Sequence, residues 1–187
     1  MKSPGRKKEP ELVRARLLRS AAELAADRGL SAVTIAETAK RAGVSTGGLF
    51  HHFPSKGKLI EALVNDFMER FEAHLVRLMA RDQEPRGRFT RAYLRASLDC
   101  EDDDLLEGGR VVGLAVAIAL DSRGAARWAS WMTEQLLKNG EDPSSALGRI
   151  IRYAADGLWL EANVSADPDR ESRLEVMAQL MAMTRQL

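Results

Sequence analysis

Apolar residues recur every three to four positions through most of this chain, which is the spacing of one buried face of an α-helix. Glycine, proline and serine separate the apolar segments and mark turns. The pattern therefore predicts an all-α fold of about nine helices. Their approximate residues are 10–28, 34–42, 45–50, 55–82, 86–99, 105–120, 123–138, 144–164 and 169–186.

The second and third of these helices are short and separated by a single tight break. Thr34 and Ser45 precede them as N-cap residues, and Glu37 completes a capping box with Thr34. Gly43 supplies the left-handed backbone that a turn between helices requires, and Pro54 ends the second helix. Two helices joined in this way form a helix-turn-helix, whose second helix fits the major groove of DNA.

Small apolar residues of the first short helix are expected to face inward, so that the second helix can approach closely. These residues are Ile35, Ala36, Ala39 and Ala42, and Val44 is expected to fill the angle between the helices. Thr46, Gly47 and Gly48 give the second helix a small, polar first turn. Such a surface suits contacts with base edges and phosphates.

The stretch AETAKRAGVSTGGLFHHFPSKGKLI, preceded by LLRSAAELAADRGLSAVTI, closely resembles the DNA-binding domain of the TetR family of bacterial regulators. The resemblance covers about a third of the chain, from Leu17 to Leu63. It implies a three-helix DNA-binding domain, followed by a helical domain that dimerises and usually binds a small ligand. It also implies that residues 45–50 are the recognition helix and that Lys56 contacts a phosphate.

This sequence has Phe50 and His51 where the family often carries two tyrosines. Phe50 has no hydroxyl to offer a phosphate, whereas His51 can donate a hydrogen bond as a neutral ring or as a cation. His51 and His52 can equally be surface and packing residues, and adjacent histidines on a helix point in different directions. The predicted DNA-contacting residues are Thr34, Ser45, Thr46, Gly47, Phe50, His51 and Lys56.

The fourth predicted helix keeps one apolar face for more than twenty residues. We expect it to join a DNA-binding domain, residues 1–57, to a regulatory and dimerisation domain, residues 58–187. A ligand that changes the tilt of this helix would change the spacing of two recognition helices, and so release DNA.

Charge is distributed unevenly, although the net charge is only +1. Residues 1–60 contain 12 Lys+Arg and 5 Asp+Glu. The remaining residues contain 16 Lys+Arg and 22 Asp+Glu. A basic first third favours nucleic acid as its partner. Residues 1–10 are polar and contain two prolines, which predicts a disordered arm, with Arg6, Lys7 and Lys8 as possible phosphate or minor-groove contacts. A solvated tail fits the same residues.

The sequence contains few signs of metal binding, catalysis or membrane insertion. The acidic run 101–104 lacks the spacing of an EF-hand and is expected to be a solvated loop. No metal-ligand motif, phosphate-binding glycine loop or nucleophile and base pair appears, so we expect no metal, no cofactor and no catalysis. Cys100 is the single cysteine, and the longest apolar run, 111–120, is too short to span a membrane. These features, and an N-terminus unlike a signal peptide, fit a cytoplasmic protein.

The last two predicted helices, within 144–187, have apolar faces wide enough to cover their own core and still bind a second copy of the chain. We therefore expect a homodimer, because one recognition helix alone binds DNA poorly. Possible ligand-binding residues are Met79, Tyr93, Leu114, Trp128 and Trp131, although buried aromatic and methionine side chains more often form plain core.

The sequence thus predicts a ligand-responsive, homodimeric regulator that binds a near-palindromic operator, in keeping with repressors of the family. Two other classes stay open. An architectural DNA-binding protein would show no response to small molecules, and a small helical enzyme would show turnover that depends on a pocket residue.

Overall fold

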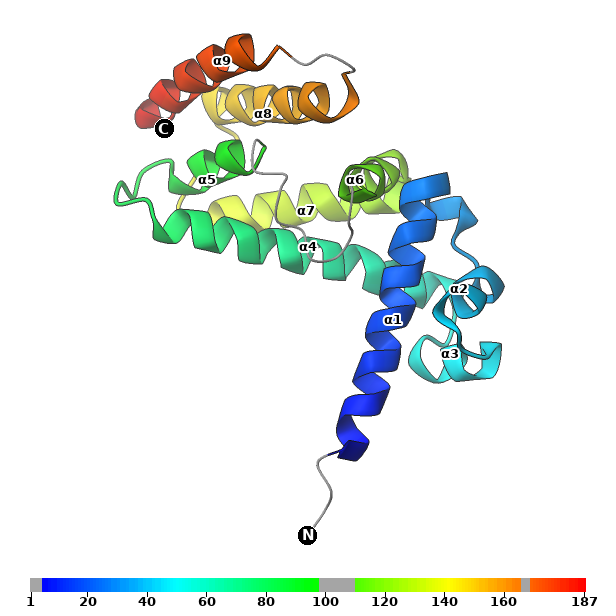
Figure 1. The fold of residues 1–187 in the computed structure, drawn as a ribbon. Coiled ribbons are helices and arrows are strands. Elements are labelled where there is room, and N and C mark those ends of the chain that lie inside the picture. The colour runs from blue at the N-terminus through cyan, green and yellow to red at the C-terminus, as the bar shows by residue number, and fades with distance from the viewer. Residues whose placement is uncertain (1–4, 98–109, 166–168) are drawn as a thin grey trace. The chain divides into compact units, whose positions relative to one another are not determined.

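The structure is a computed structural model that describes residues 5–97, 110–165 and 169–187. These residues form nine α-helices and two short 3-10 helices, and no strand occurs among them, which confirms the all-α prediction (Figure 1). The helices are α1 (Gly5–Arg28), α2 (Ile35–Ala42), α3 (Thr46–His52), α4 (Lys56–Ala80), α5 (Arg88–Ala96), α6 (Arg110–Leu120), α7 (Ser122–Lys138), α8 (Ala146–Val164) and α9 (Arg170–Met183). The 3-10 helices are η1 (Leu30–Ala32) and η2 (Thr184–Gln186).

Among the described residues, the starts of α1, α5 and α8 differ from the prediction by two residues or more. Helix α1 begins at Gly5 and contains Pro10, so the prediction of a disordered arm is wrong for residues 5–10. Lysine, arginine and glutamate, which fill residues 6–9, are good helix formers and extend the helix toward its N-terminus. Helix α5 begins at Arg88, because Gly87 before it has the left-handed φ of 68°. The predicted acidic loop, 101–104, lies outside the described residues.

The chain divides into two compact units, and α4 and α7 each contribute residues to both. The first unit comprises Met1–Met68 and Asp103–Ala125, and the second comprises Glu69–Asp102 and Ala126–Leu187. In the first unit α1 packs against α2 and α6, and α2 packs against α3. The inward stripe of α1 is Leu17, Leu18, Ala21, Leu24 and Ala25, all buried.

Helix α6 lies against α1 in the first unit at Gly113, where the α6 backbone has no room for a side chain. A Cβ on Gly113 would lie 2.6 Å from the carbonyl oxygen of Ala26. Leu114 is fully buried, but Leu120 is 83% exposed. The apolar run of α6 is therefore covered at Leu114 but exposed at the C-terminal end of the helix.

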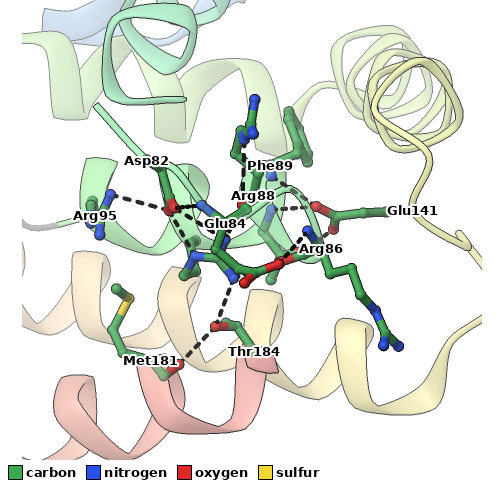
Figure 2. A network of polar contacts seen from close by, with 11 residues as sticks. Asp82, Glu84, Arg86, Arg88, Phe89, Arg95, Glu141, Met181 and Thr184 are labelled. Atoms are coloured by element: carbon green, nitrogen blue, oxygen red, sulfur yellow. Dashed lines mark hydrogen bonds and ion pairs between the residues drawn. The ribbon is translucent and has the colours of Figure 1, made fainter. Parts of the chain in front are cut away.

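A buried ion pair fixes the loop between α4 and α5 in the second unit. The Arg91 guanidinium donates to both carboxylate oxygens of Asp82, at 2.7 and 3.2 Å, and to the carbonyl oxygens of Glu84 and Arg86 (Figure 2). The Arg91 and Asp82 side chains are only 6% and 8% exposed. Arg91 also reaches the Thr184 hydroxyl at 3.5 Å, so this one side chain ties the loop to the end of α9.

The N-terminus of α5 is capped by a residue that lies far away in the sequence. Gly87 occupies the N-cap position and has no side chain to offer. One carboxylate oxygen of Glu141, between α7 and α8, instead accepts hydrogen bonds from the backbone N–H groups of Phe89 and Thr90, at 2.8 and 3.1 Å (Figure 2). Its other oxygen accepts the Thr90 hydroxyl at 2.5 Å. These bonds satisfy N–H groups that a helix start leaves without partners.

Candidate nucleic-acid interface

The backbone turn of the predicted helix-turn-helix is present. Thr34 caps α2, and its hydroxyl oxygen accepts the Glu37 N–H at 3.2 Å. Gly43 then takes the left-handed conformation, with φ 65° and ψ 35°. The N–H of Val44 donates back to the Ala39 carbonyl at 2.9 Å, which closes the end of α2. The local expectations for Thr34 and Gly43 are confirmed, because each depended only on neighbouring residues.

Helix α3 starts with a cap and two consecutive glycines that have different surroundings. The Ser45 hydroxyl accepts the Gly48 N–H at 3.0 Å, which confirms the predicted cap. A Cβ on Gly48 would lie 2.9 Å from Val44 Cγ1, whereas a Cβ on Gly47 would meet nothing closer than 4.0 Å. Gly48 is therefore required for packing inside the turn, but Gly47 is not.

Small residues pack α2 and α3 together, with one exception to the prediction. Ala39 and Ala42 are buried and Ile35 is half-buried, but Ala36 is exposed. The prediction for Ala36 is wrong because α2 is only eight residues long and its other side faces solvent. Thr38 is fully buried instead, and its hydroxyl has no hydrogen-bond partner among the described residues.

The residues that we expect to contact DNA are all exposed, and they come from a single stretch of the chain. They are Thr34, Ser45, Thr46, Gly47, Phe50, His51 and Lys56. Phe50 is 49% exposed, which is unusual for a large aromatic side chain on a seven-residue helix. The Thr34 and Ser45 hydroxyls accept hydrogen bonds as caps, and each keeps its O–H as a donor. A phosphate or base acceptor is a suitable partner for such a donor.

Lys56 is held at the first turn of α4 by a backbone group from another element. Its ammonium donates to the Ser31 carbonyl, in η1, at 3.0 Å. An ammonium group has three N–H donors, so two remain for other acceptors. The contact fixes the position of an exposed cation beside the start of the helix, where Ser55 caps α4 by accepting the Lys58 N–H at 3.2 Å.

Several other cations of the first unit are paired with carboxylates. Arg41 donates to Glu23 at 2.8 Å and lies 3.5 Å from Asp27. Glu23 also pairs with Arg19, and Asp27 with Arg110, each at 3.5 Å. These arginines have their charges compensated within the protein. Only the Arg19–Glu23 pair has the i,i+4 spacing of a helix pair. The other pairs join residues 14 to 83 positions apart, so no local pattern in the sequence indicates them.

Three of the five proposed ligand-binding residues lie together in the second unit. Tyr93, Trp128 and Trp131 form an aromatic cluster around Phe71, whose ring centroid lies 5.9, 5.5 and 5.8 Å from theirs. Phe71 was not among the predicted ligand residues, although its place on the apolar face of α4 could have indicated it. Met79 is half-buried on α4, and Leu114 belongs to the first unit.

A polar group lies at the edge of this aromatic cluster. The Tyr93 hydroxyl donates to a carboxylate oxygen of Asp156 on α8. Burial and the neighbouring Asp156 charge raise the pKa of the Tyr93 phenol well above its ordinary value. Partial removal from water raises the pKa of Asp156, against the opposing effects of the Tyr93 hydrogen bond and the Arg152 charge. The arrangement keeps the Tyr93 phenol neutral and donating.

Helices α8 and α9 pack against each other (Figure 1). Both carry large apolar side chains that are exposed. On α8, Ile150 is 55% and Tyr153 is 69% exposed, while Ile151 and Leu158 are buried. On α9, Leu174 is 51% exposed and Leu180 is buried. The two predicted apolar faces therefore divide into an inner and an outer side.

Two further expectations concern membranes and metals. Among the described residues, no helix combines the length and the apolar character needed to cross a bilayer. Within the same residues, no three His, Cys, Asp or Glu side chains come together in a way that would hold a metal ion.

Comparisons with known proteins agree with this geometry. Residues 17–63 match the profile of the bacterial regulatory proteins of the tetR family, and residues 87–185 match that of the tetracyclin repressor-like C-terminal domain. The HTH-type transcriptional repressor KstR2 of Mycolicibacterium smegmatis is 40% identical over 67 residues, which are 36% of this chain and 33% of that one. The chain thus matches about a third of the length of this relative.

Similarity over the whole length is lower. The HTH-type transcriptional regulator BetI of Paraburkholderia phytofirmans is 29% identical over 180 residues, 89% of this chain and 90% of that one. A putative regulator from Streptomyces coelicolor has the same fold, with a TM-score of 0.68 and 20% identity over 92% of this chain and 98% of that one. The structure of the multidrug binding protein EbrR complexed with malachite green also has this fold. Its TM-score is 0.61 and its identity is 22%, over 89% of this chain and 96% of that one.

Fold and turn geometry together define a protein with a helix-turn-helix domain and an all-helical second part. The two matched profiles make the family certain, since one of them alone covers residues 87–185. The chain belongs to the TetR family of bacterial regulatory proteins.

Proposed function

We propose that this chain is a ligand-responsive repressor that binds a near-palindromic operator as a homodimer. Helix α3 would enter the major groove with its first turn toward the bases, and Lys56 and His51 would bind phosphates. The observation that carries the proposal is the turn itself: Gly43 and two capped helix starts present an exposed helix with a small, polar N-terminal turn. In helix-turn-helix proteins these N-terminal residues contact the base edges.

Sequence selection from randomised duplexes by the purified chain tests the DNA-binding part of the proposal. We expect an enriched motif with two related half-sites whose centres lie about one helical turn, 34–36 Å, or a multiple of it apart. Affinity for this motif should fall steeply as salt increases, because phosphate contacts release counterions. Recovery of no motif, together with binding that ignores salt, would contradict the proposal.

Lys56→Gln and Thr46→Ala separate the two expected kinds of contact. Loss of a phosphate contact at Lys56 should weaken binding to all duplexes alike and lower the salt dependence. Loss of a side chain from the first turn of α3 should reduce the preference for the motif over unrelated DNA. Equal effects of both variants on both measurements would contradict the assigned roles.

The outer side of α8 and α9 supports the homodimer. Ile150, Tyr153 and Leu160 are exposed at helical spacing on α8, and Leu174 is exposed on α9. Gly157 lies on the same stripe of α8, and a Cβ there would meet nothing within 4 Å, which leaves room for a second helix. A symmetric interface of this kind places two recognition helices on one duplex.

Sedimentation of Tyr153→Glu tests this interface. A charge at the centre of an apolar contact should give a folded monomer that binds the selected operator much more weakly than the wild type. Glu134→Lys is the control for an altered surface charge, because the Glu134 side chain on α7 is exposed. A wild-type monomer, or a Tyr153→Glu variant that is still dimeric, would contradict the proposed interface.

The effector part of the proposal rests on the aromatic cluster of the second unit and on the family. Phe71 and Trp128 are half-buried, so part of the cluster is exposed to solvent. EbrR, which has the same fold, binds malachite green in its solved structure, and an apolar or aromatic ligand would likewise suit these rings. Mass spectrometry of compounds that copurify with the chain, followed by competition against operator binding, identifies the ligand.

An architectural DNA-binding protein is the second candidate, and it requires no effector. It predicts unchanged operator affinity in the presence of every compound that binds the second unit. The proposed division at residues 57 and 58, the absence of catalysis and the cytoplasmic location remain parts of the proposal, supported by the membership of a family of transcriptional regulators.

A further inference from the structure

Arg14 lies on α1, before the first buried turn of that helix. It continues the inward stripe of α1, since it precedes Leu18, Ala21 and Ala25 by four, seven and eleven positions. Its guanidinium carbon lies 5.1 Å from the centre of the Phe53 ring. Phe53 is the C-cap residue of the recognition helix α3, and its N–H donates to Leu49 at 2.8 Å. The contact thus holds an α1 cation beside the C-terminal end of α3.

Arg14 differs from Arg19, Arg41 and Arg110 of the first unit, because its charge is not compensated by a carboxylate of the described residues. The acidic groups Glu23 and Asp27 are taken by Arg19, Arg41 and Arg110. Among the described residues, no carboxylate oxygen lies within 4.0 Å of the Arg14 guanidinium, and Arg14 is exposed. A ring face orients a guanidinium without neutralising it, because the attraction comes from the ring quadrupole.

The dimensions of α3 indicate what this charge would meet. A helix of seven residues is about 10 Å long, and the major groove is about 12 Å wide. When the N-terminal turn of α3 lies at the bases, its C-terminal end is therefore close to a wall of the groove. The groove walls are lines of phosphates, and arginine binds a phosphate with two parallel hydrogen bonds.

We propose that Arg14, held on the Phe53 ring, is a phosphate-binding residue of the DNA interface that fixes the C-terminal end of α3 against the groove wall. This inference rests on the proposed function, and it adds α1 to the elements that touch the operator. The ring also limits the movement of the guanidinium, so that less freedom is lost when DNA binds.

Fluorescence anisotropy with the full chain and its selected operator duplex, over a series of salt concentrations, tests the inference. Arg14→Gln should raise the Kd about tenfold and reduce the slope of log K against log salt by about one for each bound copy of the chain. Arg14→Lys keeps the charge and should restore most of the slope. The matched control is Arg28→Gln, which removes another exposed charge from the other end of α1 and should leave both quantities unchanged.

Two results would overturn the inference while leaving the proposed function intact. One is an Arg14→Gln variant with the Kd and slope of Arg28→Gln. The other is a Kd that rises together with a fall in melting temperature but with no change in slope, since this would mean that Arg14 only covers Phe53. If the wild-type chain selects no DNA sequence, the proposed function itself fails and the inference fails with it.

Discussion

Gly48 lies so close to Val44 that any other residue at position 48 would overlap it: an added Cβ would be 2.9 Å from Val44 Cγ1. Valine is branched at Cβ and has little freedom to turn aside. The neighbouring Gly47 has open space, although both glycines stand in the first turn of α3. The structure therefore separates a glycine needed for folding from one that is free to serve binding.

Alanine at these two positions should have opposite effects on stability. Gly48→Ala should lower the free energy of unfolding by about 1–3 kcal/mol, because it overpacks the turn. Gly47→Ala should raise it by about 0.5–1 kcal/mol, because alanine favours the helix. Urea unfolding measures both, and equal effects in the two variants would show that the turn has no such asymmetry. If α3 approaches DNA closely, Gly47→Ala should nevertheless weaken operator binding.

The protein should become more stable when Thr38 is replaced by valine. Its hydroxyl is buried without a hydrogen-bond partner among the described residues, and an unsatisfied buried polar group costs about 1–3 kcal/mol. Valine has nearly the same shape, so Thr38→Val should raise the melting temperature. Thr38→Ser, which keeps the hydroxyl and removes the methyl group, is the control and should lower it. A valine variant that melts below the wild type would mean that the hydroxyl has a partner.

Glu141 should be essential for the start of α5. Glu141→Ala removes three hydrogen bonds, two of them to backbone N–H groups of a helix whose own N-cap is glycine. We expect a loss of about 1–3 kcal/mol in the free energy of unfolding. Glu134→Ala is the control, since that side chain is 66% exposed and makes only a 4.0 Å ion pair. Equal losses in both variants would exclude a capping role.

Protonation of Asp82 should account for part of the stability that the protein loses at low pH. The hydrogen bond from Arg91 lowers the pKa of the Asp82 carboxyl below its ordinary value of 3.8. A group with a lowered folded-state pKa stabilises the protein above its unfolded-state pKa, and this contribution is lost as the pH falls through the folded-state value. The Asp82 contribution should therefore be complete near neutral pH and disappear below about pH 4.

Asp82→Asn tests this assignment. The variant should lose about 3–5 kcal/mol at neutral pH, because it leaves the buried Arg91 charge without its partner. Its stability should then depend less on pH below about pH 4 than that of the wild type. Urea unfolding at several pH values measures both effects. Asp142→Asn is the control, since Asp142 also has a lowered pKa, caused by Ser144, but is exposed. Parallel pH profiles for Asp82→Asn and the wild type would contradict the prediction.

The sequence alone determined the features that depend on neighbouring residues. Thr34, Ser45 and Gly43 fixed the helix starts and the turn, because capping and left-handed backbone involve only a few adjacent positions. Helical periodicity likewise gave the all-α fold and most helix bounds. The weakest bounds were those of α1 and α5, where a proline and a glycine left more than one start possible.

Only the tertiary structure decided which charges remain available and which faces are covered. Arg14 and Arg41 look alike in the sequence, yet one lies on Phe53 while the other is neutralised by Glu23, 18 positions away. Glu141 caps a helix 52 positions earlier in the chain. Such contacts join residues that are distant along the chain, and their partners depend on how the helices pack, which no local pattern of residues specifies.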